Sequence, residues 1–259
     1  MDRPILKRLH SVPIMVLITL LLASCGNDDG GPTPQTEPPA TMIPTVPAGA
    51  LTVGEILTGV EAAWPSVQSM TSTFWSAEGP ASETPPTTGT VTVEDVILPA
   101  DRRVKVLTDG EATDEQVVVR GRVYMKGALV PAAIAPMVDN ETWVEVDPAA
   151  ADANSPISMQ LGYLLSPIQS PFNDISVETA ALEAVPSGEI TVDGRRCNLF
   201  TFGDPAGILY ELALDAEQLP CRLVQSAAGQ SKVTVYDFND PELTITAPTL
   251  PDQATPAER

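Results

Sequence analysis

The sequence has little histidine and little positive charge. Its 259 residues include one histidine, His10, and 14 lysines and arginines against 34 aspartates and glutamates, which gives a net charge of −20. Histidine is the commonest general base and a frequent metal ligand, so almost the whole chain lacks the side chain that most such sites use. A strongly acidic surface repels nucleic acid and anionic lipid head groups. We therefore expect no nucleic-acid partner.

Cysteine is also scarce, with only Cys25, Cys197 and Cys221 in the chain. In an exported protein the pair Cys197 and Cys221 predicts a disulfide, which would contribute about 3 kcal/mol by closing its loop. The alternative is two buried free thiols. Two cysteines without histidine cannot complete a tetrahedral zinc site unless carboxylates help, so we expect no metal.

The N-terminus combines a positive segment with a short apolar one. Arg3, Lys7 and Arg8 precede an apolar run at residues 12–22. A membrane-spanning helix needs about 20 apolar residues, whereas the apolar region of a signal peptide has about 7–15. The run therefore predicts a signal peptide, with a transmembrane anchor as the alternative.

The apolar run ends in Leu22-Ala23-Ser24-Cys25-Gly26. This segment resembles the lipobox of bacterial lipoproteins, in which small residues precede an invariant cysteine. The resemblance implies that Cys25 becomes the N-terminus and carries acyl chains, which anchor an extracytoplasmic protein to the cell membrane or outer membrane. The alternative is a secreted protein whose Cys25 pairs elsewhere. Loss of residues 1–24 removes His10 and leaves 11 basic against 33 acidic residues, a net charge of −22.

Composition divides the chain into four parts. Residues 1–24 are the predicted signal peptide. Residues 25–50 are the lipidated cysteine and a linker rich in glycine and proline, which cannot form a core and is expected to be disordered. Residues 51–248 are long enough for one domain with its own core. Residues 249–259 are expected to be a flexible tail.

The domain is predicted to begin with one helix, at residues 51–64. Thr52 and Glu55 have the spacing of a capping box. The apolar residues then recur at helical spacing: Ile56, Leu57, Val60, Ala63 and Trp64. A second short amphipathic helix is expected at residues 157–168.

Most of the remaining chain alternates with a period of two, which predicts strands. We expect strands at 70–77, 88–98, 102–108, 116–120, 122–126, 141–147, 188–192, 196–202, 208–214, 221–226, 232–238 and 243–246. Because strands and helices do not alternate regularly, an antiparallel meander is favoured over a parallel α/β sheet. In a simple meander the strand at 208–214 would hold Cys197 and Cys221 almost 10 Å apart, too far for a disulfide. A disulfide therefore requires a displaced loop residue or another strand order.

Four features follow one another in a fixed order along residues 50–248. They are the helix at 51–64 followed by a strand near 70, the segments 122–126 and 142–148, the strand pair 209–215 and 219–224, and the final segments 233–239 and 243–248. In this order they resemble the LolA-like proteins, and especially the LppX/LprAFG group of bacterial cell-envelope lipoproteins. The resemblance implies an α+β, mainly β fold, in which a curved antiparallel sheet forms an unclosed half-barrel with helices on its concave face. It also implies that acyl chains of lipids or lipoproteins bind between sheet and helices.

Apolar residues of the predicted strands and helices are the candidates for the lining of such a cavity. They are Trp64, Val91, Val93, Val104, Val106, Tyr124, Met137, Trp143, Met159, Leu161, Leu164 and Leu165. Flexible methionine side chains suit adaptable contacts with lipid. The same residues could equally form an ordinary core.

No catalytic constellation is visible, because the exported chain lacks histidine and a nucleophile elbow of the form Gly-x-Ser-x-Gly. We therefore expect a protein that is not an enzyme and carries no cofactor. We also expect it to be a monomer. The main hypothesis is a lipoprotein that binds or shuttles a lipid-like apolar ligand. The alternative is a structural or regulatory lipoprotein whose self-filled core leaves its surface to contact another envelope protein.

Overall fold

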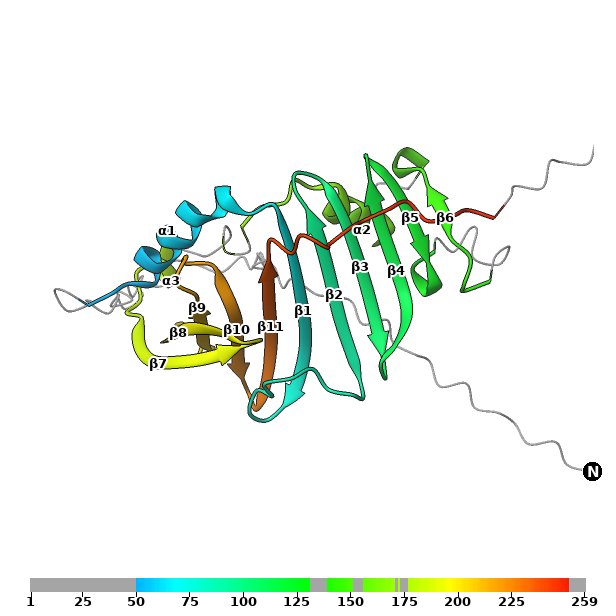
Figure 1. Cartoon of the computed structure of the whole chain (residues 1–259). Helices are drawn as coiled ribbons and strands as arrows, with labels where there is room; N and C mark the ends of the chain where they lie inside the picture. The colour runs from blue at the N-terminus through cyan, green and yellow to red at the C-terminus, as the bar shows by residue number, and fades with distance from the viewer. Residues whose placement is uncertain (1–49, 131–138, 151–155, 171, 173–176, 252–259) are drawn as a thin grey trace, which may run out of the picture. The chain divides into compact units, whose positions relative to one another are not determined.

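The computed structural model describes residues 50–130, 139–150, 156–170, 172 and 177–251. These residues form an 11-stranded antiparallel sheet in the order β6-β5-β4-β3-β2-β1-β11-β10-β9-β8-β7 (Figure 1). The strands are β1 (Ser69–Glu78), β2 (Thr90–Ile97), β3 (Asp101–Thr108), β4 (Glu111–Val119), β5 (Arg122–Lys126), β6 (Val144–Val146), β7 (Val185–Val192), β8 (Arg195–Gly203), β9 (Leu209–Leu214), β10 (Pro220–Ala227) and β11 (Gln230–Phe238). β1 pairs with both β2 and β11 and so joins two meanders, the first from β1 to β6 and the second from β7 to β11. The edge strands β6 and β7 do not pair with each other, so the sheet stays open.

Two helices of ten or more residues accompany the sheet, α1 (Val53–Ala63) and α2 (Pro156–Leu165), together with the single-turn α3 (Val177–Ala180). The predicted mainly β architecture, an open curved sheet with helices on its concave face, is confirmed. Of the residues that the structure describes, none belongs to a helix long and apolar enough to cross a membrane.

The capping box predicted for the first helix is present. The Thr52 hydroxyl accepts from the Glu55 backbone N–H at 3.1 Å, and the Glu55 carboxylate accepts from the Thr52 N–H at 2.8 Å. These two hydrogen bonds satisfy two of the N–H groups that a helix start leaves without intrahelical partners. The Thr52 hydroxyl also donates to the Glu55 carboxylate at 3.0 Å. The backbone hydrogen bond from Thr52, followed by this side-chain one, lowers the pKa of the Glu55 carboxyl.

Replacement of Thr52 by alanine should therefore destabilise the domain by about 1 kcal/mol, the usual cost of losing a helix cap. Urea denaturation of the two proteins measures this difference. Thr58 is a matched control because its hydroxyl only bonds back to the Gly54 carbonyl within the helix, so Thr58→Ala should change stability much less. Equal losses in both variants would contradict the capping role.

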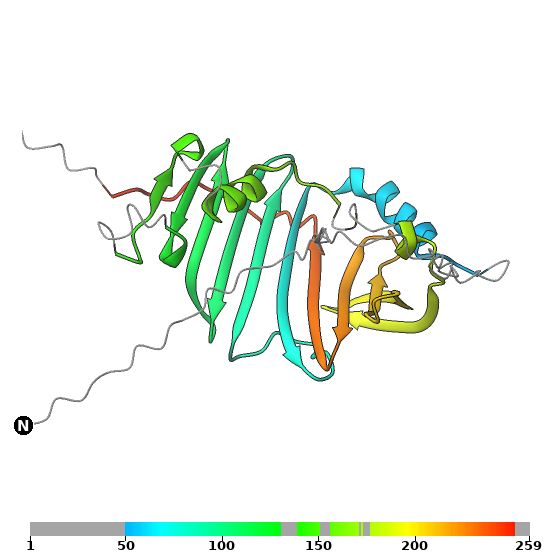
Figure 2. The ribbon, with the colours of Figure 1, turned by 180° about the vertical axis from the view of Figure 1, so that it is seen from behind.

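Both helices pack on the concave side of the sheet, which we call the helix face. At one end of the sheet, α1 buries Val53, Ile56, Leu57 and Val60 against residues that include Phe202, Leu212 and Leu214 of β8 and β9. Nearer the other end, α2 buries Leu161 and Leu164 against β4, β5 and β6. Figure 2, the view from behind, shows α2 lying across the strands of the first meander.

The other side of the sheet, the outer face, is crossed by residues 240–251, which run over the first meander on the side opposite α2 (Figures 1 and 2). Ile245 is buried there with Val117 and Tyr124, and Leu250 packs against the same cluster. The contacts thus reach two residues past the predicted end of the domain at 248. The strand predicted at 243–246 is wrong, because this segment crosses the sheet strands instead of pairing with one.

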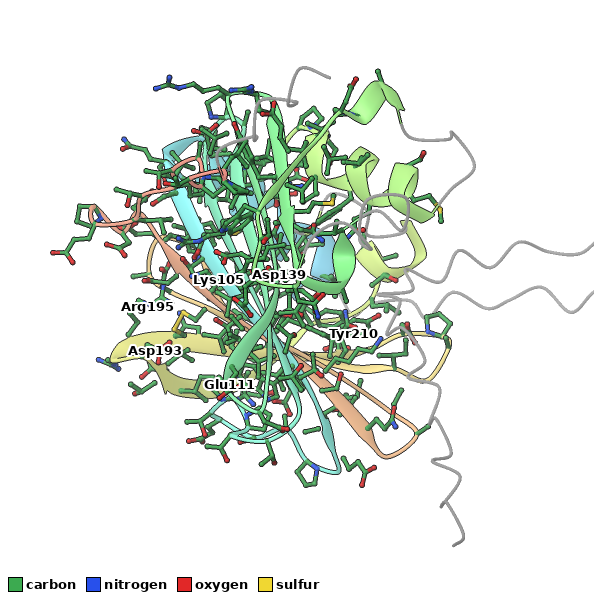
Figure 3. The ribbon with its side chains drawn as sticks, turned by 90° about the vertical axis from the view of Figure 1, so that its right-hand side faces the viewer. Lys105, Glu111, Asp139, Asp193, Arg195 and Tyr210 are labelled. Atoms are coloured by element: carbon green, nitrogen blue, oxygen red, sulfur yellow. A yellow bond between two sulfur atoms is a disulfide. The ribbon has the colours of Figure 1, made fainter. Side chains whose placement is uncertain are left out.

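Figure 3, which turns the sheet to the side, separates the two faces. Lys105 and Arg195 lie on the side away from the helices, and Tyr210 lies on the helix side. The register explains this division, since Lys105 pairs with Val93 and Glu115 on the outer face. Tyr210 stacks on Phe202, which belongs to the apolar cluster between α1 and the sheet, with ring centroids 4.9 Å apart.

Candidate functional site

The helix face around α2 is the candidate site, because here an apolar helix covers apolar strands. Leu161 and Leu164 are 3% and 2% exposed. They share one cluster with Val118, Val123, Met125, Val130 and Val146, and with the partly buried Val104 and Val144. Leucines three apart lie on the same side of a helix, which is why this pair turns toward the sheet.

Three polar side chains lie within this apolar region: Glu94 of β2, Arg102 of β3 and Tyr163 of α2. The Tyr163 hydroxyl donates to the Glu94 carboxylate at 3.0 Å. Arg102 Nε lies 3.0 Å from Glu94 Oε1, and Arg102 also donates to the backbone carbonyl of Tyr163 at 2.5 Å. The guanidinium carbon is 4.7 Å from the centroid of the Tyr163 ring. We call this group the α2 latch, because it joins the helix to two strands by polar contacts.

Burial dominates the electrostatics of the latch. The side chains of Arg102 and Glu94 are 6% and 17% exposed. Burial raises the pKa of the Glu94 carboxyl, and the positive Arg102 and the Tyr163 hydrogen bond only partly oppose it. Burial, followed by the negative Glu94, raises the pKa of the Tyr163 hydroxyl, which therefore stays protonated and able to donate.

A hollow of about 250 Å³ opens at the C-terminal end of α2. It is lined by Leu165, the last residue of α2, and by Ser166 and Pro167 after it. Pro99 and Ala100 between β2 and β3, and Val118 and Gly121 around the turn between β4 and β5, complete the lining. Its lining is apolar except for Ser166 and the backbone. It is somewhat smaller than the usual ligand site of about 300–1,000 Å³, so it suits part of one apolar chain.

The twelve predicted cavity residues do not form one lining. Those on the helix face are Trp64, which meets Phe238 edge to face, Val104, Val106, Leu161 and Leu164. Those on the outer face are Val91, Val93, Tyr124 and Trp143. Leu165 lines the hollow and is 41% exposed, and Met159 is 61% exposed. Met137 lies outside the described residues. The division follows from the pleat, which sends neighbouring residues of a strand to opposite faces.

The α2 latch was not predicted. In the strand predicted at 88–98, Thr90, Thr92 and Glu94 alternate with valines, and nothing within that strand marks Glu94 as largely buried. The register supplies the missing information, because Glu94 pairs with Val104, and Val96, its neighbour on the same face, pairs with Arg102. The diagonal neighbours Glu94 and Arg102 would have predicted an ion pair if the hairpin register had been worked out.

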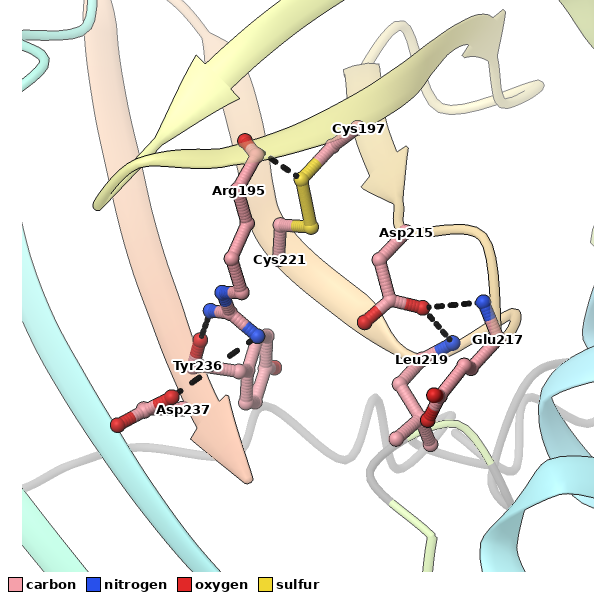
Figure 4. Close-up of a disulfide and its surroundings, with 8 residues drawn as sticks. All are labelled: Arg195, Cys197, Asp215, Glu217, Leu219, Cys221, Tyr236 and Asp237. Atoms are coloured by element: carbon pink, nitrogen blue, oxygen red, sulfur yellow. Dashed lines mark hydrogen bonds and ion pairs between the residues drawn. A yellow bond between two sulfur atoms is a disulfide. The ribbon is translucent and has the colours of Figure 1, made fainter. Parts of the chain in front are cut away.

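Cys197 and Cys221 form a disulfide with their Cα atoms 6.6 Å apart (Figure 4). The strand order is the simple meander, with β9 between β8 and β10, so a different order does not explain the bond. Instead the ladder of β10 shifts register between Pro220 and Arg222, which places Cys221 in a bulge. The disulfide then spans the small, fully buried Ala213 of β9.

The tip of the β7–β8 hairpin is held close to β11 as well. Arg195 donates to the Tyr236 carbonyl, and its guanidinium lies 3.9 Å from the Asp237 carboxylate. Figure 4 shows these contacts beside the disulfide. The separation of almost 10 Å expected for Cys197 and Cys221 is therefore wrong, because it assumed flat strands at even spacing. Bulges bend a strand and increase its twist.

Within the described ranges, no three histidine, cysteine, aspartate or glutamate side chains are grouped so that they could hold a metal ion. The polar residues of the turn after β11 make hydrogen bonds within the protein. Asn239 accepts a hydrogen bond from the Gln68 N–H at 2.7 Å, and Asp240 accepts one from the Glu242 N–H at 2.8 Å. These contacts shape the turn from which residues 240–251 start.

Known structures with a similar fold include two lipoproteins. LppX from Mycobacterium tuberculosis is 11% identical with a TM-score of 0.47, over 75% of this chain and 98% of that chain. LprF from Mycobacterium bovis is 13% identical with a TM-score of 0.43, over 77% and 99%. A LolA superfamily protein from Nitrosomonas europaea is 10% identical with a TM-score of 0.27, over 78% and 96%. No protein-family model and no curated protein matches the chain. Such identities and TM-scores carry no evidence about function.

Proposed function

We propose that this protein is a monomeric, non-catalytic lipoprotein of the cell envelope, anchored by acyl chains on Cys25, which binds or shuttles a lipid-like apolar ligand on its helix face. The domain of residues 51–248 would be held outside the cytoplasm by the linker at 25–50. The observation that carries the proposal is the apolar hollow at the end of α2, which continues from the apolar cluster beneath the helix. No reaction is needed, since removing apolar surface from water yields about 25 cal/mol per Å².

The second candidate is a structural or regulatory lipoprotein that contacts another envelope protein. It is favoured by the middle of the helix face, where the protein's own side chains fill the space that a ligand would need. Trp64, Ile168 and Phe238 pack with Met70 and Tyr236 in the middle of the helix face. This packing leaves the hollow beside α2, and not the centre of the sheet, as the place for a ligand.

Native mass spectrometry of the mature chain with Cys25→Ser, mixed with phospholipids and fatty acids, separates the two candidates. We expect one acyl-containing ligand to stay bound. Ala100 lines the hollow, so Ala100→Trp should fill it and lower the bound fraction about tenfold. Ala206→Trp is the control, because Ala206 is an exposed residue in the turn between β8 and β9. If no ligand binds, or if both variants bind equally well, the carrier proposal fails and the second candidate is favoured.

A further inference from the structure

Part of the exposed surface of α2 is apolar. Met159 and Leu165 are 61% and 41% exposed, whereas Leu161 and Leu164 between them in the sequence are buried. Helices on the surface of a soluble domain usually carry charged or polar residues on their outer side. The sequence of α2, PISMQLGYLL, contains no charged residue at all.

The lack of charge extends beyond the helix. Residues 153–173 contain no aspartate, glutamate, lysine or arginine, in a chain that carries 34 acidic residues. The charges beneath the helix are paired with each other, since Arg102 lies against Glu94. A negative chain is repelled by anionic head groups, and this segment is a place where that repulsion is weakest.

The proposed anchor supplies the partner for this surface. Residues 26–50, as a flexible linker, would have a root-mean-square span of about 25–30 Å, so the domain would on average lie at about that distance from the bilayer. Tethering at such a distance gives an effective concentration in the millimolar range. Weak apolar contacts then suffice to hold a preferred orientation.

We propose that the exposed part of α2, with Met159 and Leu165, is a docking surface for a phospholipid bilayer. This inference rests on the proposed function, because it assumes the anchor on Cys25. The methionine and leucine side chains enter the acyl region of the bilayer. Leu165 belongs both to this surface and to the lining of the hollow. Docking therefore sets the hollow against the membrane, which gives an acyl chain a route that avoids water.

Hydrogen exchange tests the docking surface on the intact mature chain. Cys197 and Cys221 are bonded to each other, so Cys25 is available for coupling to phosphatidylcholine vesicles that contain a maleimide lipid. We expect exchange in residues 158–166 to slow about tenfold relative to the same chain capped with a small maleimide. Exchange in β9 should not change. Equal exchange with and without vesicles would overturn the proposal.

Paired charge substitutions make the test specific. Met159→Glu with Leu165→Glu should abolish the slowing, because an ionised carboxylate cannot enter the acyl region without a large loss of hydration. Val185→Glu with Leu209→Glu is the control, since these apolar residues of β7 and β9 are 50% and 49% exposed and far from α2 in the sheet order. Loss of the slowing in the control pair would also overturn the proposal.

Ligand binding without vesicles keeps this inference separate from the proposed function. If fatty acid binds in native mass spectrometry but the vesicles leave α2 unchanged, the docking surface is wrong and the carrier stands. If α2 is protected by vesicles but no ligand binds, the docking surface stands and the carrier fails.

Discussion

Replacement of Arg102 by methionine should destabilise the domain by about 3–5 kcal/mol at neutral pH, because it leaves the Glu94 carboxylate buried without its counter-charge. The side chains of Arg102 and Glu94 are 6% and 17% exposed, so water cannot take the place of the guanidinium. The substitution also removes the donor to the Tyr163 carbonyl and the cation over the Tyr163 ring. Urea denaturation measures the loss of unfolding free energy.

The loss should shrink as the pH falls. Burial already raises the pKa of the Glu94 carboxyl in the wild-type fold, and removal of Arg102 raises it further. Between the unfolded pKa, near the ordinary value of 4.5, and this raised folded pKa, the folded state binds the proton more tightly than the unfolded state. Stability from this group therefore rises on acidification through that window and is lost as the pH rises through the folded pKa.

Two further variants check the cause. Glu94→Gln combined with Arg102→Met should recover most of the stability, because no charge then stays buried. Arg122→Met is the matched control, since Arg122 pairs with Glu145 at 2.8 Å but its side chain is 63% exposed. It should cost at most about 1 kcal/mol. If Arg102→Met costs no more than Arg122→Met, or costs the same at every pH, the α2 latch does not carry the stability assigned to it.

The sequence predicted the elements of this fold better than their arrangement. Local signals were sufficient for α1, whose capping box and apolar spacing lie within 14 residues of chain. They were also sufficient for β3, where Arg103 and Lys105 alternate with Val104 and Val106, and for β5, whose centre is a short apolar run. The first half of β4 was missed, because Glu111, Ala112 and Thr113 are exposed and carry no apolar pattern. Pairing with β3 makes that segment a strand.

The arrangement of the site could not be predicted from single strands. A period of two assigns residues to two faces but does not say which face the helices cover, so Val91 and Tyr124 were grouped with Val104. The C-terminal segment shows the same limit. Leu243 and Ile245 alternate with threonines as a strand would, yet Ile245 packs across the outer face on Val117. The same alternation of apolar and polar residues in the sequence is therefore found in a segment that packs across a sheet and in a strand of the sheet.

Loss of the disulfide is the second large effect that we expect. Cys197→Ala with Cys221→Ala should lower the unfolding free energy by about 3 kcal/mol, because it frees the unfolded chain from a loop closed over 24 residues. The effect should concentrate at the β7–β8 hairpin. There Val192 packs with both cysteines and Ala213, and Arg195 is the hairpin's polar contact with β11.

Urea denaturation measures this loss, and hydrogen exchange should show faster opening of β7 and β8 than of β3 and β4. Arg195→Met in the wild-type background is the companion variant. Because the Arg195 side chain is 27% exposed and its ion pair with Asp237 is long, it should cost much less than the two cysteines. A thiol assay on the unfolded Cys25→Ser chain decides the state of the pair. No reactive thiol is expected, and two would restore the alternative of free cysteines.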